Sequence, residues 1–317
     1  MPTCGHVSRQ SLRHGGLDRE YLYLLPRSAC GGGRADGKAH QTLSALRLPL
    51  LVLVHCFGCS ARDELGKFAA AAEAASFALL APEGMWSSWN TPSCCGEAKA
   101  NKLDDFGFLD AVVTDAAASL PVARGALFGS GFSNGGFVTS LLPSRSTHTW
   151  RGLAPVAGHE YEFDARAPVP VSMHHCEADR AVQFGGCCDG EPHCCCGIGA
   201  GRSSCVGAVA LHARWLSLNR CKGARRAFGV GGAVCHVGHG CAANTSLCAF
   251  PRDGGCYHAQ WARQFAGTES IVQFFAAEVG DGCDPPHADG ERVTCGWSRL
   301  RKGAGAGSGR ERGAGGK

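Results

Sequence analysis

The stretch GFSNG, Gly131–Gly135, has the form G-x-S-x-G and follows the short apolar run Ala126–Phe128. An apolar strand that ends in this pentapeptide predicts a nucleophile elbow, a tight strand-to-helix turn that exposes the serine hydroxyl. Glycine two residues before and after Ser133 allows the turn to close. The helix that follows points its first N–H groups at the space above the hydroxyl. The same letters also fit an ordinary glycine-rich turn, so the surrounding sequence has to decide.

Short apolar runs that fit β-strands alternate with amphipathic patterns that fit helices through most of the chain. This alternation favours an α/β fold with a mainly parallel sheet covered by helices on both faces. The expected strands are Tyr21–Leu25, Leu50–Val54, Phe77–Leu80, Ala126–Phe128, Leu153–Ala157, Val169–His174 and Leu247–Phe250. The expected helices are Leu65–Ala75, a helix capped by Asp104 and Asp105, Asn134–Leu142, Val206–Leu218 and Ile271–Ala277.

The composition is that of a soluble globular protein, with 44% hydrophobic and 18% charged residues among 317. No apolar run approaches the ~20 residues that a membrane-spanning helix needs. The net charge of +4 belongs to residues 301–317, so residues 1–300 are formally neutral. A nucleic-acid partner is not expected, because the body of the chain has no surplus of basic residues. The glycine- and alanine-rich tail from 301 is expected to be disordered.

Twenty cysteines are many for a reduced cytosolic enzyme, and they favour disulfides and an extracellular location. Many of them gather in a Cys/Gly-rich insertion at about 185–205. Residues 1–25, however, show no basic segment followed by an apolar one, as a secretion signal would. Three explanations remain open at this point: an incomplete start, unconventional export, or thiols that stay reduced.

A serine nucleophile needs a base, and the base needs an orienting acid. In α/β-hydrolases these follow the serine in the order acid, then histidine. Asp179 is the candidate acid, because it follows the expected strand Val169–His174; Asp164 and Asp189 are placed less well.

His258 is the candidate base, because it lies between the expected strand Leu247–Phe250 and the last helix. Two further histidines, His236 and His239, precede that strand. Their spacing with Cys235 and Cys241 also invites a metal-binding interpretation.

An oxyanion hole requires two N–H donors near the nucleophile. One is expected from the backbone of Asn134, and the other from Cys56 or Phe57 in the loop after the strand Leu50–Val54. Trp86 and Trp89 are candidates for the wall of a substrate pocket, although buried core positions suit tryptophan equally well.

Several segments share a combined pattern that is more specific than any one of them. On these segments, about residues 15–278, the chain resembles the polyhydroxybutyrate depolymerase and feruloyl esterase family of serine esterases. The matching segments are Pro49–His55, Ser88–Asn90, Cys94–Gly96, Asp104–Phe108, Gly131–Gly136, His175–Asp179, Trp215 with Asn219 and Cys221, and His258 with Trp261.

This resemblance implies a secreted α/β-hydrolase that forms an acyl-enzyme on Ser133, with Asp179 and His258 as partners and no cofactor or metal. Its substrate would be an aliphatic polyester oligomer or an aromatic or acylated carbohydrate ester. The chain also departs from the family pattern, since Cys56 and Cys176 stand where the family commonly has glycine. If either position needs a positive φ, the Cβ costs on the order of 1–2 kcal/mol.

The expected organisation is an N-terminal extension (1–14), a catalytic domain (15–283) and a C-terminal extension (284–317). Two other functions remain open from the sequence. One is a non-catalytic or metal-binding cysteine-rich protein on the same fold, and the other is a serine peptidase or thioesterase that uses the same triad.

Overall fold

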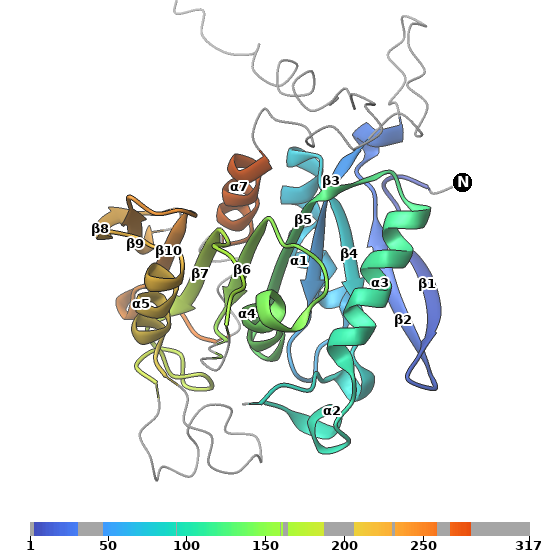
Figure 1. The fold of residues 1–317 in the computed structure, drawn as a ribbon, viewed down its shortest axis with the longest axis horizontal. Helices are drawn as coiled ribbons and strands as arrows, with labels where there is room; N and C mark the ends of the chain where they lie inside the picture. The colour runs from blue at the N-terminus through green and yellow to red at the C-terminus, as the bar shows by residue number, and fades with distance from the viewer. Residues whose placement is uncertain are drawn as a thin grey trace, which may run out of the picture. The chain divides into compact units, whose positions relative to one another are not determined.

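A single mixed β-sheet organises the described part of the chain, in the order β1-β2-β4-β3-β5-β6-β7-β10-β9-β8 (Figure 1). The computed structural model describes residues 3–30, 47–92, 94–158, 160, 164–186, 206–229, 232–258 and 267–279. The central strands run parallel and are β4 (Ala78–Pro82), β3 (Leu48–Val54), β5 (Val122–Phe132), β6 (Gly152–Val156), β7 (Val171–Cys176) and β10 (Thr245–Phe250).

Antiparallel hairpins extend this parallel centre on both sides. The hairpin β1 (Ser8–His14) and β2 (Leu17–Leu24) pairs with β4, and the hairpin β8 (Gly223–Phe228) and β9 (Val234–His239) pairs with β10. This topology confirms the predicted α/β-hydrolase-type sheet.

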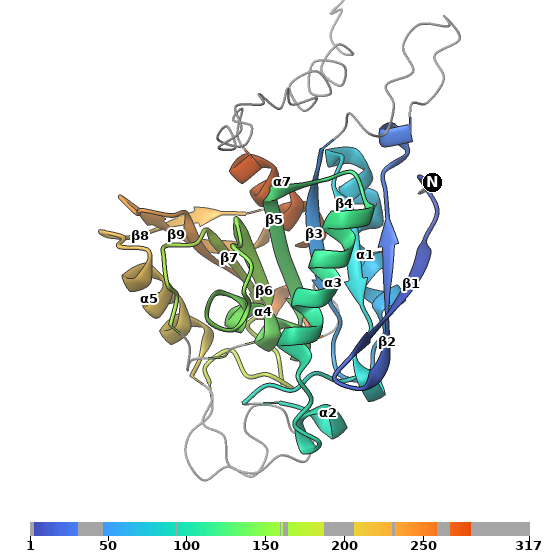
Figure 2. The ribbon, with the colours of Figure 1, turned by 45° about the vertical axis from the view of Figure 1, so that its right-hand side comes forward.

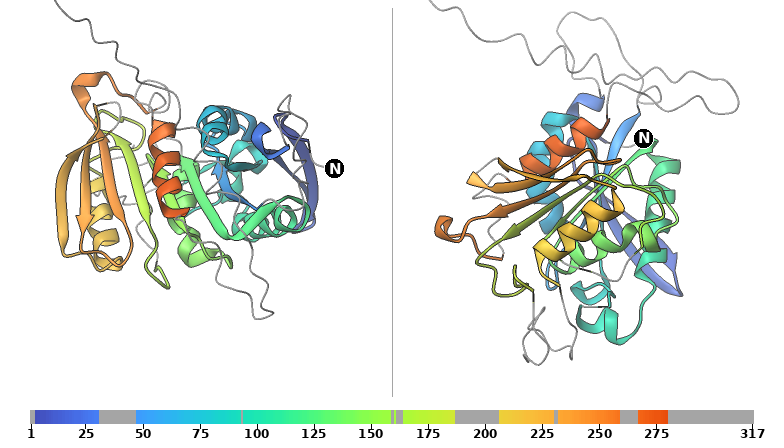
Figure 3. Two further views of the ribbon diagram at one scale, coloured as in Figure 1. Left: turned by 90° about the horizontal axis from the view of Figure 1, so that it is seen from above. Right: turned by 60° about the vertical axis from the view of Figure 1, so that its left-hand side comes forward.

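Helices cover both faces of the sheet. α1 (Ala61–Ala75) and α7 (Gly267–Val279) contact each other on one face, while α3 (Asp105–Ser119), α4 (Asn134–Arg145) and α5 (Ala208–Leu218) lie on the other (Figure 3). The short helix α2 (Gly96–Ala100) lies near the edge at which the parallel strands end (Figure 2). No helix in the described ranges is long and apolar enough to cross a membrane.

The helix starts follow from their capping residues. Ser60 and Asp63 form a reciprocal capping box at the start of α1. As the sequence predicted, Asp104 caps α3, and its side chain accepts a hydrogen bond from the N–H of Gly107. Each cap fixes the residue at which its helix begins.

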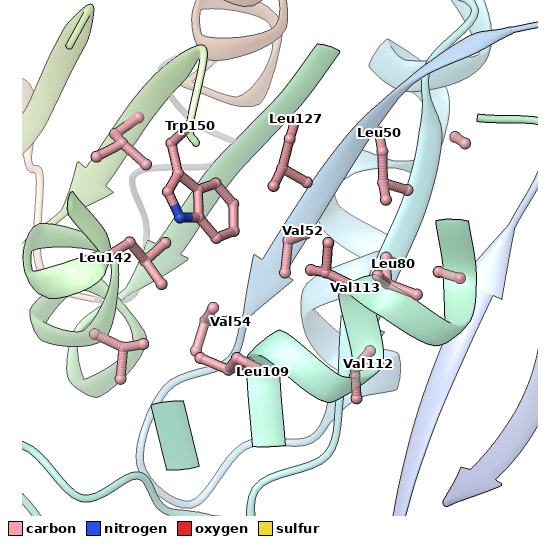
Figure 4. Packing of buried hydrophobic residues seen from close by; sticks show 14 of the residues in the cluster. Leu50, Val52, Val54, Leu80, Leu109, Val112, Val113, Leu127, Leu142 and Trp150 are labelled. Carbon is pink, nitrogen blue, oxygen red and sulfur yellow. The ribbon is translucent and has the colours of Figure 1, made fainter. Parts of the chain in front are cut away.

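The main core lies between the parallel strands and α3. Every residue of β3 is buried, and its side chains Leu50, Val52 and Val54 face Leu109 and the neighbouring aliphatic residues of α3 (Figure 4). Burial of each such side chain is worth about 1.5–3 kcal/mol. The ends of β3 and β5 are therefore held by a rigid interior.

Cysteine pairing confirms the expected disulfides for twelve of the twenty cysteines. The pairs are Cys4–Cys30, Cys56–Cys59, Cys94–Cys95, Cys176–Cys256, Cys221–Cys241 and Cys235–Cys248. The remaining cysteines, including those of the insertion, lie outside the described residues. At the base of the insertion, Gly186 and Val206 form an antiparallel β-bridge, so the two described ends of this segment meet.

The N-terminal segment contributes a strand that the sequence analysis did not predict. Residues 8–14 were expected in an N-terminal extension, yet Ser8–His14 forms the edge strand of the sheet. The sequence also gave no sign of β8 and β9. β1 and β8 are edge strands whose side chains are mostly exposed, so they lack the apolar runs that reveal the central strands. The expected C-terminal extension, 284–317, lies outside the described residues.

Buried histidines make the stability of this fold depend on pH. His174 on β7 is 1% exposed, and burial lowers its pKa to about 4. Between that value and the ordinary pKa of about 6.5, the unfolded chain binds more protons than the folded one. The free energy of unfolding therefore rises with pH across this window. The stability that neutral His174 contributes is lost as the pH falls from about 6.5 to about 4.

We expect His174→Leu to flatten this dependence. Its slope between pH 4 and 6.5 should fall by up to about 1.4 kcal/mol per pH unit, measured by urea unfolding at several pH values. The exposed His6 provides a control, and His6→Leu should follow the wild-type slope. An unchanged slope in His174→Leu would contradict the lowered pKa of His174 in the folded protein.

Candidate active site

Ser133 occupies a strained turn between β5, which ends at Phe132, and α4, which begins at Asn134. Its φ of 56° and ψ of −115° are rare for a residue with a side chain. The Ser133 N–H donates to the Val156 carbonyl at 2.9 Å, which ties the turn to β6. This is the strand–turn–helix context that a nucleophile elbow requires.

The glycines around Ser133 are needed because backbones touch there. A Cβ on Gly131 would lie 2.4 Å from the Gly135 carbonyl oxygen, and one on Gly135 would lie 1.9 Å from that of Val54. A Cβ on Gly136 would lie 2.5 Å from the carbonyl oxygen of Val156. The turn is therefore packed directly against the ends of β3 and β6.

The structure brings Ser133, His258 and Asp179 into one hydrogen-bonded chain. His258 Nε2 lies 2.9 Å from Ser133 Oγ, and His258 Nδ1 lies 2.6 Å from Asp179 Oδ2. Nδ1 donates, since a carboxylate only accepts, which leaves the Nε2 lone pair facing the serine hydroxyl. This arrangement can remove the Ser133 proton.

Asp179 is held in its ionised form by several donors. Its Oδ1 accepts from the N–H groups of Ala181 and Val182, at 2.8 and 2.9 Å. Burial alone would raise the pKa of Asp179, but hydrogen bonds from His175 and His258 outweigh burial and keep that pKa below its usual range. The acid therefore stays charged at neutral pH and can orient the imidazole.

The other candidate acids and histidines do not join this hydrogen-bonded chain in the described part of the structure. Asp164 has a 97% exposed side chain and faces Arg214, while Asp189 lies outside the described residues. His236 and His239 are on β9, in the hairpin beyond β10. Cys235 and Cys241, which suggested a metal site with them, are both in disulfides. Among the described residues there is no group of three or more side chains suited to hold a metal ion.

The loop after β3 makes a tight turn beside the elbow. The Cys59 N–H donates to the Cys56 carbonyl, a disulfide joins the two residues, and Gly58 has a φ of 72°. Only Gly58 in this turn has left-handed backbone. Cys56 and Cys176 do not, so the strain expected if these positions needed glycine is absent. Asn134 is the first residue of α4, where helical N–H groups lack intrahelical partners.

His55 fixes this loop from inside, a role that sequence reasoning missed. Its Nδ1 donates to the Cys56 carbonyl at 2.8 Å, and its Nε2 accepts from the Gly84 N–H at 2.9 Å. Burial lowers the pKa of His55 to about 4, so the ring is neutral at physiological pH. A neutral ring is required here, because Nε2 has to accept.

Trp89, a candidate for the pocket wall or for the core, takes a buried core position. The side chain is fully buried, and its Nε1 donates to the His55 carbonyl at 2.9 Å. Its backbone N–H and carbonyl both bond to the side chain of Asn134. Trp86 is different: it is 48% exposed on the same segment, whose Ser87 carbonyl accepts from Gly58 N–H.

A buried ion pair is bonded to the segment that carries Trp86 and Trp89. Arg19 on β2 and Asp105 at the start of α3 lie 2.8 Å apart, and both are almost fully buried. The second oxygen of Asp105 accepts from the N–H of Asn90. The sequence showed Asp105 as a capping residue, but gave no signal that Arg19, 86 residues away, would pair with it.

Comparisons with known proteins agree with this geometry at the level of the fold. No family model matches the chain. The predicted esterase NocK of Nocardia uniformis subsp. tsuyamanensis is 29% identical over 145 residues, which span 44% of this chain and 42% of NocK. The chain thus matches less than half the length of this curated relative.

A solved esterase structure shares the fold, and a second is similar at a lower score. A thermostable esterase superposes with a TM-score of 0.52 at 11% identity, over 85% of this chain and 62% of that one. Est1E from Butyrivibrio proteoclasticus gives a TM-score of 0.48 at 12% identity, over 86% of this chain and 99% of Est1E. At 11% identity, the likeness to the thermostable esterase establishes the α/β-hydrolase-type fold alone.

The contact of Gly135 with β3 can be tested by adding one methyl group. Gly135→Ala should lower the free energy of unfolding by about 3 kcal/mol, because the Cβ overlaps the Val54 carbonyl. Gly66 in α1 is a matched control, since a Cβ there meets nothing within 4 Å. Gly66→Ala should raise stability by about 0.5–1 kcal/mol. Equal stability of the two variants in urea unfolding would contradict this packing.

Proposed function

We propose that this protein is a serine carboxylic-ester hydrolase. The observation that carries the proposal is the position of His258, which hydrogen-bonds Ser133 Oγ with one ring nitrogen and Asp179 with the other. The strained elbow at Ser133 supports it independently. The similar proteins named as esterases add support at the level of the reaction class.

In the proposed first step, Ser133 Oγ attacks the ester carbonyl while His258 Nε2 accepts the serine proton. The electron pair of the carbonyl moves to its oxygen, which receives N–H donors from Asn134 and from Cys56 or Phe57. Collapse of this intermediate expels the alcohol, which takes the proton from His258. Water then attacks the acyl-enzyme by the same route, releases the acid and restores Ser133.

The substrate class proposed here is an aliphatic polyester oligomer or an aromatic or acylated carbohydrate ester. Trp86 supplies a half-exposed aromatic surface next to the Cys56–Cys59 turn. An apolar or aromatic acyl group could pack on it. Gly186, which bridges to Val206 at the base of the insertion, follows Asp179 by seven residues, so the insertion is proposed to shape the other side of the pocket.

We also propose that the protein is secreted and that the catalytic domain continues to about residue 283. The paired cysteines support an oxidising compartment. Asn244 begins an Asn-Thr-Ser sequon whose asparagine is available for glycosylation only in the secretory pathway.

Ser133→Ala should lower kcat for a short-chain p-nitrophenyl ester by at least about 10⁴-fold, because it removes the nucleophile. Ser130→Ala is a matched control: Ser130 is a buried serine of β5 that bonds the Ala154 carbonyl and lies outside the triad. This control should retain most activity.

Covalent labelling tests the mechanism directly. A fluorophosphonate probe should modify Ser133, as identified by peptide mass spectrometry, and the label should disappear in His258→Ala. Turnover retained by Ser133→Ala, or a folded wild-type protein that takes no label, would refute the proposed function.

A further inference from the structure

One covalent bond joins the two loops that carry the acid and the base. Cys176, the last residue of β7, lies three residues before Asp179, and Cys256 lies two residues before His258. Their disulfide spans 80 residues of sequence. We propose, building on the esterase function above, that the Cys176–Cys256 disulfide is a positioning element that holds the His258 imidazole between Asp179 and Ser133.

The acid does not need this bond, because its own loop fixes it. Asp179 N–H donates to the Cys176 carbonyl, and its carboxylate accepts from the N–H groups of Ala181 and Val182. His175 Nε2 also lies 3.3 Å from Asp179 Oδ2. These contacts involve only residues 175–182, so Asp179 should keep its place when the disulfide is absent.

The base depends on the bond much more. After β10 ends at Phe250, the chain makes the short 3₁₀ turn Arg252–Gly254 and reaches His258 through a loop. Within the described residues, the His258 ring is held by its two hydrogen bonds and by a ring contact with Phe132 at 4.7 Å. Next to it, Tyr257 is 56% exposed. Among the described residues, the disulfide is the covalent attachment of this loop to the sheet.

The surroundings of the bond fit a permanent tether. Cys176 is 2% exposed and Cys256 is fully buried, so solvent thiols have little access to either sulfur. Cys176 is the last residue of β7, and its backbone is ordinary strand without a positive φ. The Cys176 side chain can therefore form a bond without backbone strain, and its disulfide attaches the Cys256 loop to β7.

A tether that only stabilised the fold would leave turnover unchanged in a folded variant. A tether that positions His258 should lower kcat with little effect on KM, because it changes the fraction of molecules with an aligned base. Misplacing a catalytic group by about 1 Å can cost about 100-fold in rate. For a loop that still visits the correct position, we expect a loss of about tenfold or more.

The test compares two double variants of the full chain. Cys176→Ala/Cys256→Ala removes the tether. Cys235→Ala/Cys248→Ala is the matched control, because that pair is similarly buried and joins β9 to β10 without carrying a triad residue. Kinetics are measured at a temperature below the unfolding transition of both double variants. The first variant should lose about tenfold or more in kcat and in the rate of fluorophosphonate labelling, with KM within about twofold. The control should stay within about twofold in each.

A second readout does not depend on turnover. The proton between His258 Nδ1 and Asp179 Oδ2 should give a far-downfield proton NMR resonance, assigned by its absence in His258→Ala. This resonance should broaden or vanish in Cys176→Ala/Cys256→Ala and persist in the control. If the alanine pair does not fold, Cys176→Val/Cys256→Ala refills much of the lost volume without the bond.

The results separate the two proposals. If Cys176→Ala/Cys256→Ala matches the control in labelling rate and in the proton resonance, the bond stabilises the fold without positioning His258. That result would overturn this inference. A wild-type protein without hydrolysis or labelling would refute the esterase function. The resonance and its loss in the variant would still test the tether in that case.

Discussion

The site depends on the contact between the turn at Ser133 and the end of β3. Gly135 lies so close to the Val54 carbonyl that no side chain fits between them. This contact brings the Cys56–Cys59 turn, which follows β3, beside the first N–H groups of α4. Ser133, the proposed nucleophile, and the expected oxyanion donors are therefore placed by backbone packing at the edge where parallel strands end, which is where open α/β sheets form their sites.

Buried polar groups then fix the loops around this contact. His55, Asn134 and Trp89 form a hydrogen-bonded set that joins the β3 loop, the elbow and the segment between β4 and α2. The Arg19–Asp105 pair holds the segment between β4 and α2 through the hydrogen bond from the Asn90 N–H to Asp105. Buried polar groups are costly unless paired, so each of these groups specifies one arrangement of the loops.

Disulfides add a covalent frame at the same edge. Cys56–Cys59 closes the expected oxyanion turn, and Cys176–Cys256 joins the loops of Asp179 and His258. The Cys94–Cys95 pair packs with Phe137 of α4 and Val182 of the acid loop in a small separate core. Loops of this kind bury little apolar surface, and cross-links compensate by restricting the unfolded chain.

The sequence alone determined what depends on short-range pattern. The apolar runs revealed the parallel strands, the G-x-S-x-G stretch revealed the elbow, and chain order selected Asp179 and His258. Exposed edge strands such as β1 gave no such signal. Only the tertiary structure decided that Trp89 is buried, that Arg19 pairs with Asp105, and that Cys176 pairs with Cys256. Local propensities act over a few residues, whereas these contacts join segments that meet only after the sheet has formed.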